Sequence, residues 1–273
     1  MRVLLFAPML LLAGCSPAGG NPQQRAPQGV VSIDYCADQM LLKLVPRERV
    51  KGVSQEADVD QYFAAPRAAG LARVRPDIES ILRLNPAIVV KSYGGGPTLD
   101  AALAKTNIKV VQLGYAGTLS DIRTQMLEAA KALDADAAGQ ESVANFDKQL
   151  SAIAPPKTRP FLLYLTPGGV TTGTGSLIDD AIRAAGYRNY ETRAGWRSLP
   201  IERLARAKPD VILAAFFDNK AHNQDAWSSA RHPLVQSRLR SVPVVKVPGS
   251  AVSCGNWLIG DVIEQLAALR RAS

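Results

Sequence analysis

The sequence contains little of what enzyme active sites usually need. Only two histidines occur in 273 residues, His222 in a polar stretch and His232 before a proline, and neither lies in a motif that pairs it with a nucleophile or a metal. No Ser, Cys or Asp stands in a nucleophile motif, and the cysteine and histidine spacing does not make a zinc site. We therefore expect a protein without catalysis and without a cofactor of its own. A surface-tethered hydrolase on an α/β scaffold is the alternative.

The sequence also lacks the features of a nucleic-acid-binding protein. The formal net charge is +8, but the lysines and arginines are scattered among acids, with no basic run and no aromatic-rich ribonucleoprotein motif. A basic solvated surface explains the charge, and no nucleic-acid partner is expected. The segment 171–176 precedes a predicted helix as a phosphate loop would, yet it has no lysine, so it indicates a turn and a helix cap.

No apolar run reaches the roughly 20 residues that a membrane-spanning helix requires. The N-terminus has instead one cation, Arg2, followed by a short apolar stretch and Leu12-Ala13-Gly14-Cys15, which resembles a bacterial lipobox. We expect residues 1–14 to be a lipoprotein signal peptide and Cys15 to carry lipid. An ordinary signal peptide with an incidental cysteine is the alternative. Residues 15–29 are poor in apolar side chains and predict a flexible tether.

Two cysteines remain once Cys15 is assigned to lipid. They are Cys36 and Cys254, and the exported location is oxidising, so a disulfide between them is allowed. Spacing alone does not show that they meet, and two free buried thiols are the alternative.

From Val30 onward, short apolar β-branched runs alternate with amphipathic stretches, which is typical of mostly parallel α/β sheets. We predict two α/β lobes, residues 30–133 and 157–273, each with a mostly parallel sheet flanked by helices. The tract 118–154 predicts two consecutive helices, broken around Asp134 to Gly139, and the second would join the lobes as a long rigid helix within residues 134–156. The predicted strands are residues 30–33, 50–53, 87–91, 110–113, 161–165, 211–215 and 244–247.

Ligands of parallel α/β sheets bind beyond the carboxyl ends of the strands, so these positions are the candidate site. Aromatic side chains recur there, and two tryptophans with a neighbouring arginine could join them. They would give a large planar ligand a flat apolar surface with a few polar handles. Packing at the edge of the core is the alternative. The candidate ligand-binding residues are Tyr35, Tyr93, Tyr115, Trp196, Arg197, Phe217 and Trp257.

Several segments together resemble one family. They are residues 31–42, the two similar units 76–90 and 199–213, and the segment 247–257 with its Val-Pro-Gly and Cys-Gly-Asn-Trp. In this they resemble the periplasmic substrate-binding proteins of ABC importers for iron-siderophores, haem and cobalamin, whose two lobes are joined by a rigid helix. The resemblance implies a monomer in the periplasm, here held to the membrane by its lipid, that captures a metal chelate. It would deliver the chelate to a permease dimer with its ATPase subunits. A lipoprotein that only scaffolds partners is a further alternative.

The resemblance also assigns roles to single residues. Glu79 and Glu202 stand at matching points of the two similar units and would dock onto arginines of the permease; plain helix capping is the alternative. The segments holding Cys36 and Cys254 resemble cleft-lining loops on opposite lobes, so a disulfide would tie the lobes across the mouth of the cleft. Unlike many binders of anionic siderophores, the sequence has no arginine cluster at the strand ends. Lys91 and Arg197 are the candidate cations, which favours cobalamin or another weakly charged chelate.

Overall fold

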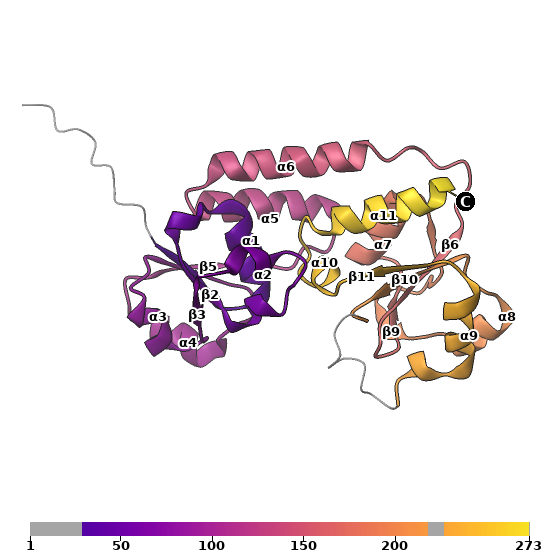
Figure 1. The fold of residues 1–273 in the computed structure, drawn as a ribbon, viewed down its shortest axis with the longest axis horizontal. Coiled ribbons are helices and arrows are strands. Elements are labelled where there is room, and N and C mark those ends of the chain that lie inside the picture. Colours follow the sequence, from indigo (N-terminus) through magenta and orange to yellow (C-terminus); the bar gives the residue numbers. More distant parts are fainter. Residues whose placement is uncertain (1–28, 218–226, 273) are drawn as a thin grey trace, which may run out of the picture.

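The computed structural model describes residues 29–217 and 227–272 (Figure 1). The predicted signal peptide, Cys15 and nearly all of the predicted tether lie outside the described residues, as does His222. Within the described part of the chain, no helix has both the length and the apolar character needed to cross a bilayer.

The N-terminal lobe is built on a five-stranded parallel sheet of order β3-β2-β1-β4-β5. Successive side chains of its central strands enter different cores: Ile88 and Val90 belong to one cluster, and Val89 to another. Both faces are therefore covered by helices, which explains why these strands are near-continuous apolar runs. The strands are β1 (Val30–Ser32), β2 (Val50–Ser54), β3 (Ala72–Val74), β4 (Ile88–Lys91) and β5 (Lys109–Gln112); the helices include α1 (Tyr35–Leu44), α2 (Ala64–Ala68), α3 (Ile78–Arg83) and α4 (Gly96–Leu103).

The C-terminal lobe repeats the plan with a four-stranded parallel sheet of order β11-β10-β6-β8, plus an antiparallel ribbon of β7 and β9. The predicted strands of both lobes are present, whereas the short strands β3, β7, β8 and β9 were not predicted. The elements are β6 (Phe161–Leu165), β7 (Val170–Thr172), α7 (Leu177–Ala184), β8 (Arg188–Asn189), β9 (Trp196–Ser198), α8 (Ile201–Arg206), β10 (Val211–Ala215), α9 (Pro233–Ser241), β11 (Val244–Val247), α10 (Ser250–Ser253) and α11 (Ile259–Ala272).

Two consecutive helices connect the lobes, as predicted, but the second begins earlier than expected. They are α5 (Leu119–Ala132) and α6 (Asp136–Ser151), and the break between them contains Asp134 with a φ of 52°. Gly139, which the sequence suggested as part of the break, lies inside α6. A Cβ there would stand 2.3 Å from the Cβ of Ala130, so this glycine allows α5 and α6 to pack closely rather than ending a helix.

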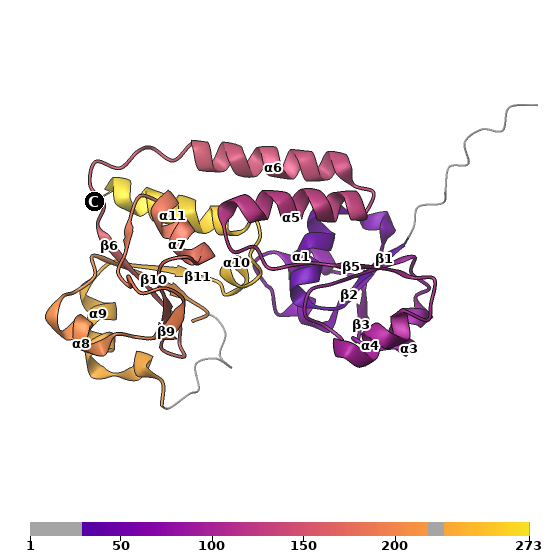
Figure 2. The same cartoon turned by 180° about the vertical axis from the view of Figure 1, so that it is seen from behind.

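The two lobes share more than a connecting helix. In both views, α6 runs along one side of the molecule, over α5 at one end and toward α11 at the other (Figures 1 and 2), and it packs against both. One continuous hydrophobic cluster includes Ile122 of α5, Phe146 of α6, Tyr164 of β6 and Ile263 of α11. Because this core crosses from one sheet to the other, relative motion of the lobes must deform packed helices.

Candidate ligand-binding site

Asp34 ties together the loops at the carboxyl ends of the N-lobe strands. It follows β1, is 1% exposed, and caps α1 by accepting a hydrogen bond from the backbone N–H of Ala37 at 2.9 Å. Its second carboxylate oxygen accepts from the N–H groups of Ser92 at 2.6 Å, Tyr93 at 3.2 Å and Gly94 at 3.0 Å. The loop that carries Tyr93 is thereby fixed beside the start of α1.

Asp38, one turn further along α1, is fully buried and joins the ends of β1 and β2. Its carboxylate accepts hydrogen bonds from the hydroxyls of Ser32 and Ser54, and from the backbone N–H of Ser54 at 2.8 Å. Burial raises the pKa of Asp38 to about 6, although these hydrogen bonds oppose the rise. The buried polar groups of Ser32, Asp38 and Ser54 beneath the N-lobe strand ends therefore satisfy one another's hydrogen bonds.

Two predicted ligand residues, Tyr35 and Tyr93, meet at one carboxylate. The Tyr93 hydroxyl donates to Oε2 of Glu56 at 2.6 Å, and the backbone N–H of Tyr35 donates to the same oxygen at 3.1 Å. Burial, reinforced by this hydrogen bond, raises the pKa of Tyr93 well above its usual range. The Tyr93 side chain is nevertheless 57% exposed. Tyr35, Glu56 and Tyr93 form what we call the N-lobe wall.

Two other predicted residues, Tyr115 and Trp196, come from different lobes and lie around a buried tyrosine. The ring of Tyr164 contacts that of Trp196 edge to face, with centroids 5.9 Å apart. Burial raises the pKa of Tyr164, and the nearby Tyr115 hydroxyl raises it further. Tyr164 is 1% exposed, but Tyr115 is 57% and Trp196 55% exposed. Large rings from both lobes are thus open to solvent around one buried phenol.

A set of bonds from the first turns of α1 reaches across to the segment around α10, and we call it the cross-lobe clamp. Cys36 and Cys254 form a disulfide, as the sequence allowed. The hydroxyls of Tyr35 and Ser253 are hydrogen-bonded at 2.6 Å, and the side-chain amide of Gln39 donates to the carbonyl of Ser250 at 3.2 Å and accepts from Asn256.

Gly255 completes the close approach of the two lobes. It adopts a φ of +59°, and a Cβ there would stand 2.9 Å from the carbonyl oxygen of Ala116. Only glycine combines this backbone conformation with this contact.

Two predicted aromatic residues are not part of this arrangement. Trp257 is 8% exposed and packs edge to face on Phe63 at 5.4 Å, with Lys43 Nζ 5.6 Å from its ring, so the structure places it in the core. Phe217 is half-buried and packs against the C-lobe core cluster. The preceding Phe216 has a φ of 68°, an uncommon conformation for a bulky residue, directly at the end of β10.

The two predicted cations have other partners. Lys91 is 4% exposed and pairs with Asp100 of α4. Arg197 follows Trp196 on β9 and therefore points to the opposite face of the ribbon, where it donates to the carbonyl of Ala194 at 2.7 Å. Although burial opposes the shift, hydrogen bonds from Arg193 and the charge of Arg197 lower the pKa of Glu191.

Glu79 and Glu202 lie in the first turns of α3 and α8, one in each lobe, and both are exposed. Both helices lie on the side of the sheets away from α6 (Figure 1). Asp77, not Glu79, supplies the side-chain cap of α3, and in the described residues neither glutamate accepts a hydrogen bond. Helix capping therefore does not account for them.

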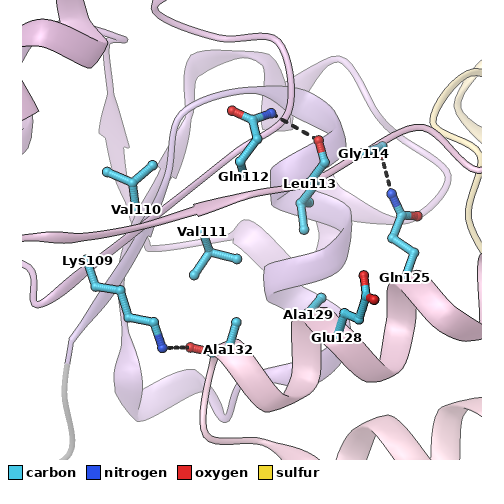
Figure 3. A pocket seen from close by; sticks show the side chains of 10 residues that line it. All are labelled: Lys109, Val110, Val111, Gln112, Leu113, Gly114, Gln125, Glu128, Ala129 and Ala132. Carbon is cyan, nitrogen blue, oxygen red and sulfur yellow. Dashed lines mark hydrogen bonds between the residues drawn. The ribbon is translucent and has the colours of Figure 1, made fainter. Parts of the chain in front are cut away.

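A cavity of about 270 Å³ lies where the edge strand β5 meets α5, lined among others by Lys109, Val111 and Gln125 (Figure 3). Lys109 Nζ donates to the carbonyl of Ala132 at 2.6 Å, and Gln125 donates to the carbonyl of Gly114. The volume is below the roughly 300 Å³ at which small-molecule pockets begin, and none of the exposed aromatic residues lines it. We do not assign the ligand to this cavity.

Within residues 29–217 and 227–272, no three His, Cys, Asp or Glu side chains are grouped to hold a metal ion.

Glu56, Tyr164 and Ser253 belong to this arrangement but were not predicted. Glu56 had a signal, because it follows the strand that ends at Ser54, and the rule used for the other strand ends applies there as well. Tyr164 lies inside β6, and Ser253 lies in α10 and reaches the site through its hydrogen bond to Tyr35. Neither residue follows a predicted strand, so the rule used for strand ends does not find them.

Comparison with known proteins agrees with this architecture. A family model described as periplasmic binding protein matches residues 30–235. A cobalamin-binding protein of Halobacterium salinarum is 27% identical over 217 residues; the match covers 75% of this chain and 57% of the relative, so the chain spans little more than half of that protein's length.

Two solved structures have the same fold. The periplasmic heme-binding protein HutB of Vibrio cholerae superimposes with a TM-score of 0.71 at 19% identity, covering 89% of this chain and 99% of HutB. The periplasmic heme-binding protein RhuT of Roseiflexus sp. RS-1 superimposes with a TM-score of 0.70 at 19% identity, covering 90% and 99% of the two chains.

Proposed function

The chain belongs to the periplasmic binding protein family, and we propose that it captures a metal chelate between its two lobes and delivers it to the permease of an ABC importer. The observation that carries the proposal is the set of exposed rings contributed by both lobes, Tyr93, Tyr115 and Trp196. Exposed large aromatic side chains offer flat apolar surface that a planar or polycyclic ligand can cover. Members of this family are solute-binding proteins, not enzymes, so the hydrolase alternative is set aside.

Among metal chelates, we infer a ligand of cobalamin type ahead of haem or a ferric siderophore. The relative named a cobalamin-binding protein supports this choice, and so do Lys91 and Arg197, which are engaged elsewhere and leave the exposed rings without these two cations. We propose that the metal arrives inside the ligand and that the protein needs no cofactor of its own.

Tryptophan fluorescence tests the proposed function directly. Titration of the chain with cyanocobalamin, haemin and a panel of ferric siderophores, corrected for their absorbance, should give saturable quenching at micromolar or lower concentration with one of these classes. Trp196 is 55% exposed and its ring contacts that of Tyr164, so the Trp196→Phe variant should lose part of the quenching, while Trp227 and Trp257 supply the rest. Calorimetry on both proteins separates a lost signal from lost binding. Absence of saturable binding of every class would contradict the proposal and favour the scaffold alternative.

The family supports a periplasmic or extracellular location. We further propose that Cys15 is the lipid-modified first residue of the mature protein, which would keep the binding protein close to the permease. Mass spectrometry of the N-terminal peptide from the exported protein checks this. A mature N-terminus at another residue, or an unmodified Cys15, would contradict it.

We propose that Glu79 and Glu202 dock the protein on the permease. Two exposed carboxylates, one in each lobe, suit a two-fold permease through charge-assisted hydrogen bonds. The double substitution Glu79→Lys and Glu202→Lys should reduce ligand uptake at least tenfold and leave the affinity for free ligand unchanged. Glu141→Lys on α6, on the other side of the molecule, is the control and should transport normally. Normal uptake by the double variant would contradict the docking assignment.

A further inference from the structure

We propose that Glu56 selects the ligand by charge, favouring a chelate that presents amide hydrogen-bond donors over one that presents carboxylates. This inference rests on the proposed function and assigns a specificity-determining residue to the same site. It concerns the N-lobe wall of Tyr35, Glu56 and Tyr93, which places a carboxylate beside the exposed Tyr93 ring.

The position of Glu56 fits this role. It lies in the short 3₁₀ helix Gln55–Asp58 at the carboxyl end of β2, and its side chain is exposed beside the Tyr93 ring. Oε2 receives both the Tyr93 hydroxyl and the Tyr35 N–H, which hold the carboxylate in place. Within the described residues, Oε1 accepts no hydrogen bond, so it is available to a donor on the ligand.

Within the described residues, no lysine or arginine forms an ion pair with Glu56, and Arg73, which reaches the same 3₁₀ helix, is paired with Asp58. Lys91 is buried and paired with Asp100, and Arg197 lies on the face of its ribbon opposite Trp196. A carboxylate on the ligand that approached Glu56 within a few ångströms would be repelled in a partly desolvated site, where charge interactions are stronger than in water. An N–H donor at the same place would gain a charge-assisted hydrogen bond.

The candidate ligands differ in this chemistry. Cobalamin carries several primary amide side chains around its corrin ring, whereas haem carries two carboxylates at one edge of its ring. Both contain a large conjugated ring system that aromatic side chains such as Tyr93, Tyr115 and Trp196 would contact, so the aromatic residues alone do not distinguish them. The Glu56 carboxylate does.

Glu56 could instead matter only because it positions Tyr93, and two variants separate these roles. In Glu56→Gln, the side-chain carbonyl still accepts from the Tyr93 hydroxyl and the Tyr35 N–H, so the ring stays in place and only the charge is removed. In Tyr93→Phe, the hydroxyl partner is removed and the charge remains. Glu48→Gln removes an equal charge from an exposed position in the turn that precedes β2 and serves as the control.

The experiment is to measure the dissociation constants of cyanocobalamin and haemin for the wild type and these three variants. We expect the wild type to prefer cyanocobalamin, and Glu56→Gln to shift the ratio of the two constants toward haemin by about tenfold. Glu48→Gln and Tyr93→Phe should leave the ratio within about threefold of the wild type. If Glu56→Gln still binds both ligands with an unchanged ratio of dissociation constants, charge selection by Glu56 is overturned, whereas the proposed function is not. Failure of every protein to bind either ligand would overturn the proposed ligand class, and with it this inference.

Discussion

Replacing both Cys36 and Cys254 by serine should lower the free energy of unfolding by about 3 to 5 kcal/mol, because the disulfide closes a very long loop of the unfolded chain. The two residues are 218 positions apart, and the bond joins α1 of one lobe to the end of α10 in the other. Urea titrations of the wild type and the double variant measure the effect. Reducing the wild type should reproduce the loss, whereas reductant should not change the double variant.

The same substitution should loosen the lobes without releasing them. Three hydrogen bonds of the cross-lobe clamp and the shared core remain, so the lobes should stay associated but show a broader distribution of separations. Electron-spin resonance between labels on unnatural amino acids at Ala101 of α4 and Ser237 of α9 measures this distribution. Tyr35→Phe, which removes one hydrogen bond and keeps the disulfide, is the control and should leave it nearly unchanged. Equal distributions in the wild type and the double-serine variant would show that the disulfide does not limit the motion.

The clamp restricts how a permease could release the ligand. On the side of α6, the lobes share a packed helical layer, and at the start of α1 they are bonded covalently. If the disulfide persists during transport, the lobes can separate only by bending or twisting about these two attachments. Docking through one helix of each lobe, at Glu79 and Glu202, would apply force on the side of the sheets away from the helical layer that the lobes share.

Much of the fold could be predicted because the strands and helices are specified by residues that are close together in the sequence. The parallel strands are continuous apolar runs, and the helices between them begin and end near residues such as Pro76, Pro86 and Pro243, which restrict the backbone. The prediction that Gly139 belongs to the break between the two helices was wrong because the role of this glycine depends on a tertiary contact. A glycine in a helix and a glycine that ends a helix look alike in sequence, and only the approach of Ala130 distinguishes them.

The candidate site was harder to predict, because residue type and position do not fix the direction of a side chain. Tyr35 and Tyr93 do meet at Glu56, and Tyr115 and Trp196 lie around Tyr164. Trp257 lies in the core against Phe63. Arg197 was expected beside Trp196, but the two are neighbours on a strand of an unpredicted ribbon and so face opposite ways. Whether each of these residues touches the ligand stays a prediction.

Asp34→Ala should be about as damaging as loss of the disulfide, at roughly 3 kcal/mol or more of unfolding free energy, because it leaves several N–H groups without their acceptor. Asp34 is 1% exposed and accepts from the backbone N–H groups of Ala37, Ser92, Tyr93 and Gly94. The measurement is again urea denaturation, with hydrogen exchange at residues 92–94 as a local reporter. These amides should lose protection first, because they belong to the loop that Asp34 holds.

Asp77→Ala is the matched control for Asp34→Ala. Asp77 also caps a helix, but it is half-buried, and among the described residues it accepts only from the backbone N–H and the hydroxyl of Ser80. Its loss should lower the unfolding free energy by about 1 kcal/mol. Equal losses in the two variants would show that Asp34 acts only as a cap. A larger loss in Asp34→Ala, accompanied by weaker ligand binding, would show that one buried carboxylate both stabilises the N-terminal lobe and places Tyr93 on the surface that the ligand covers.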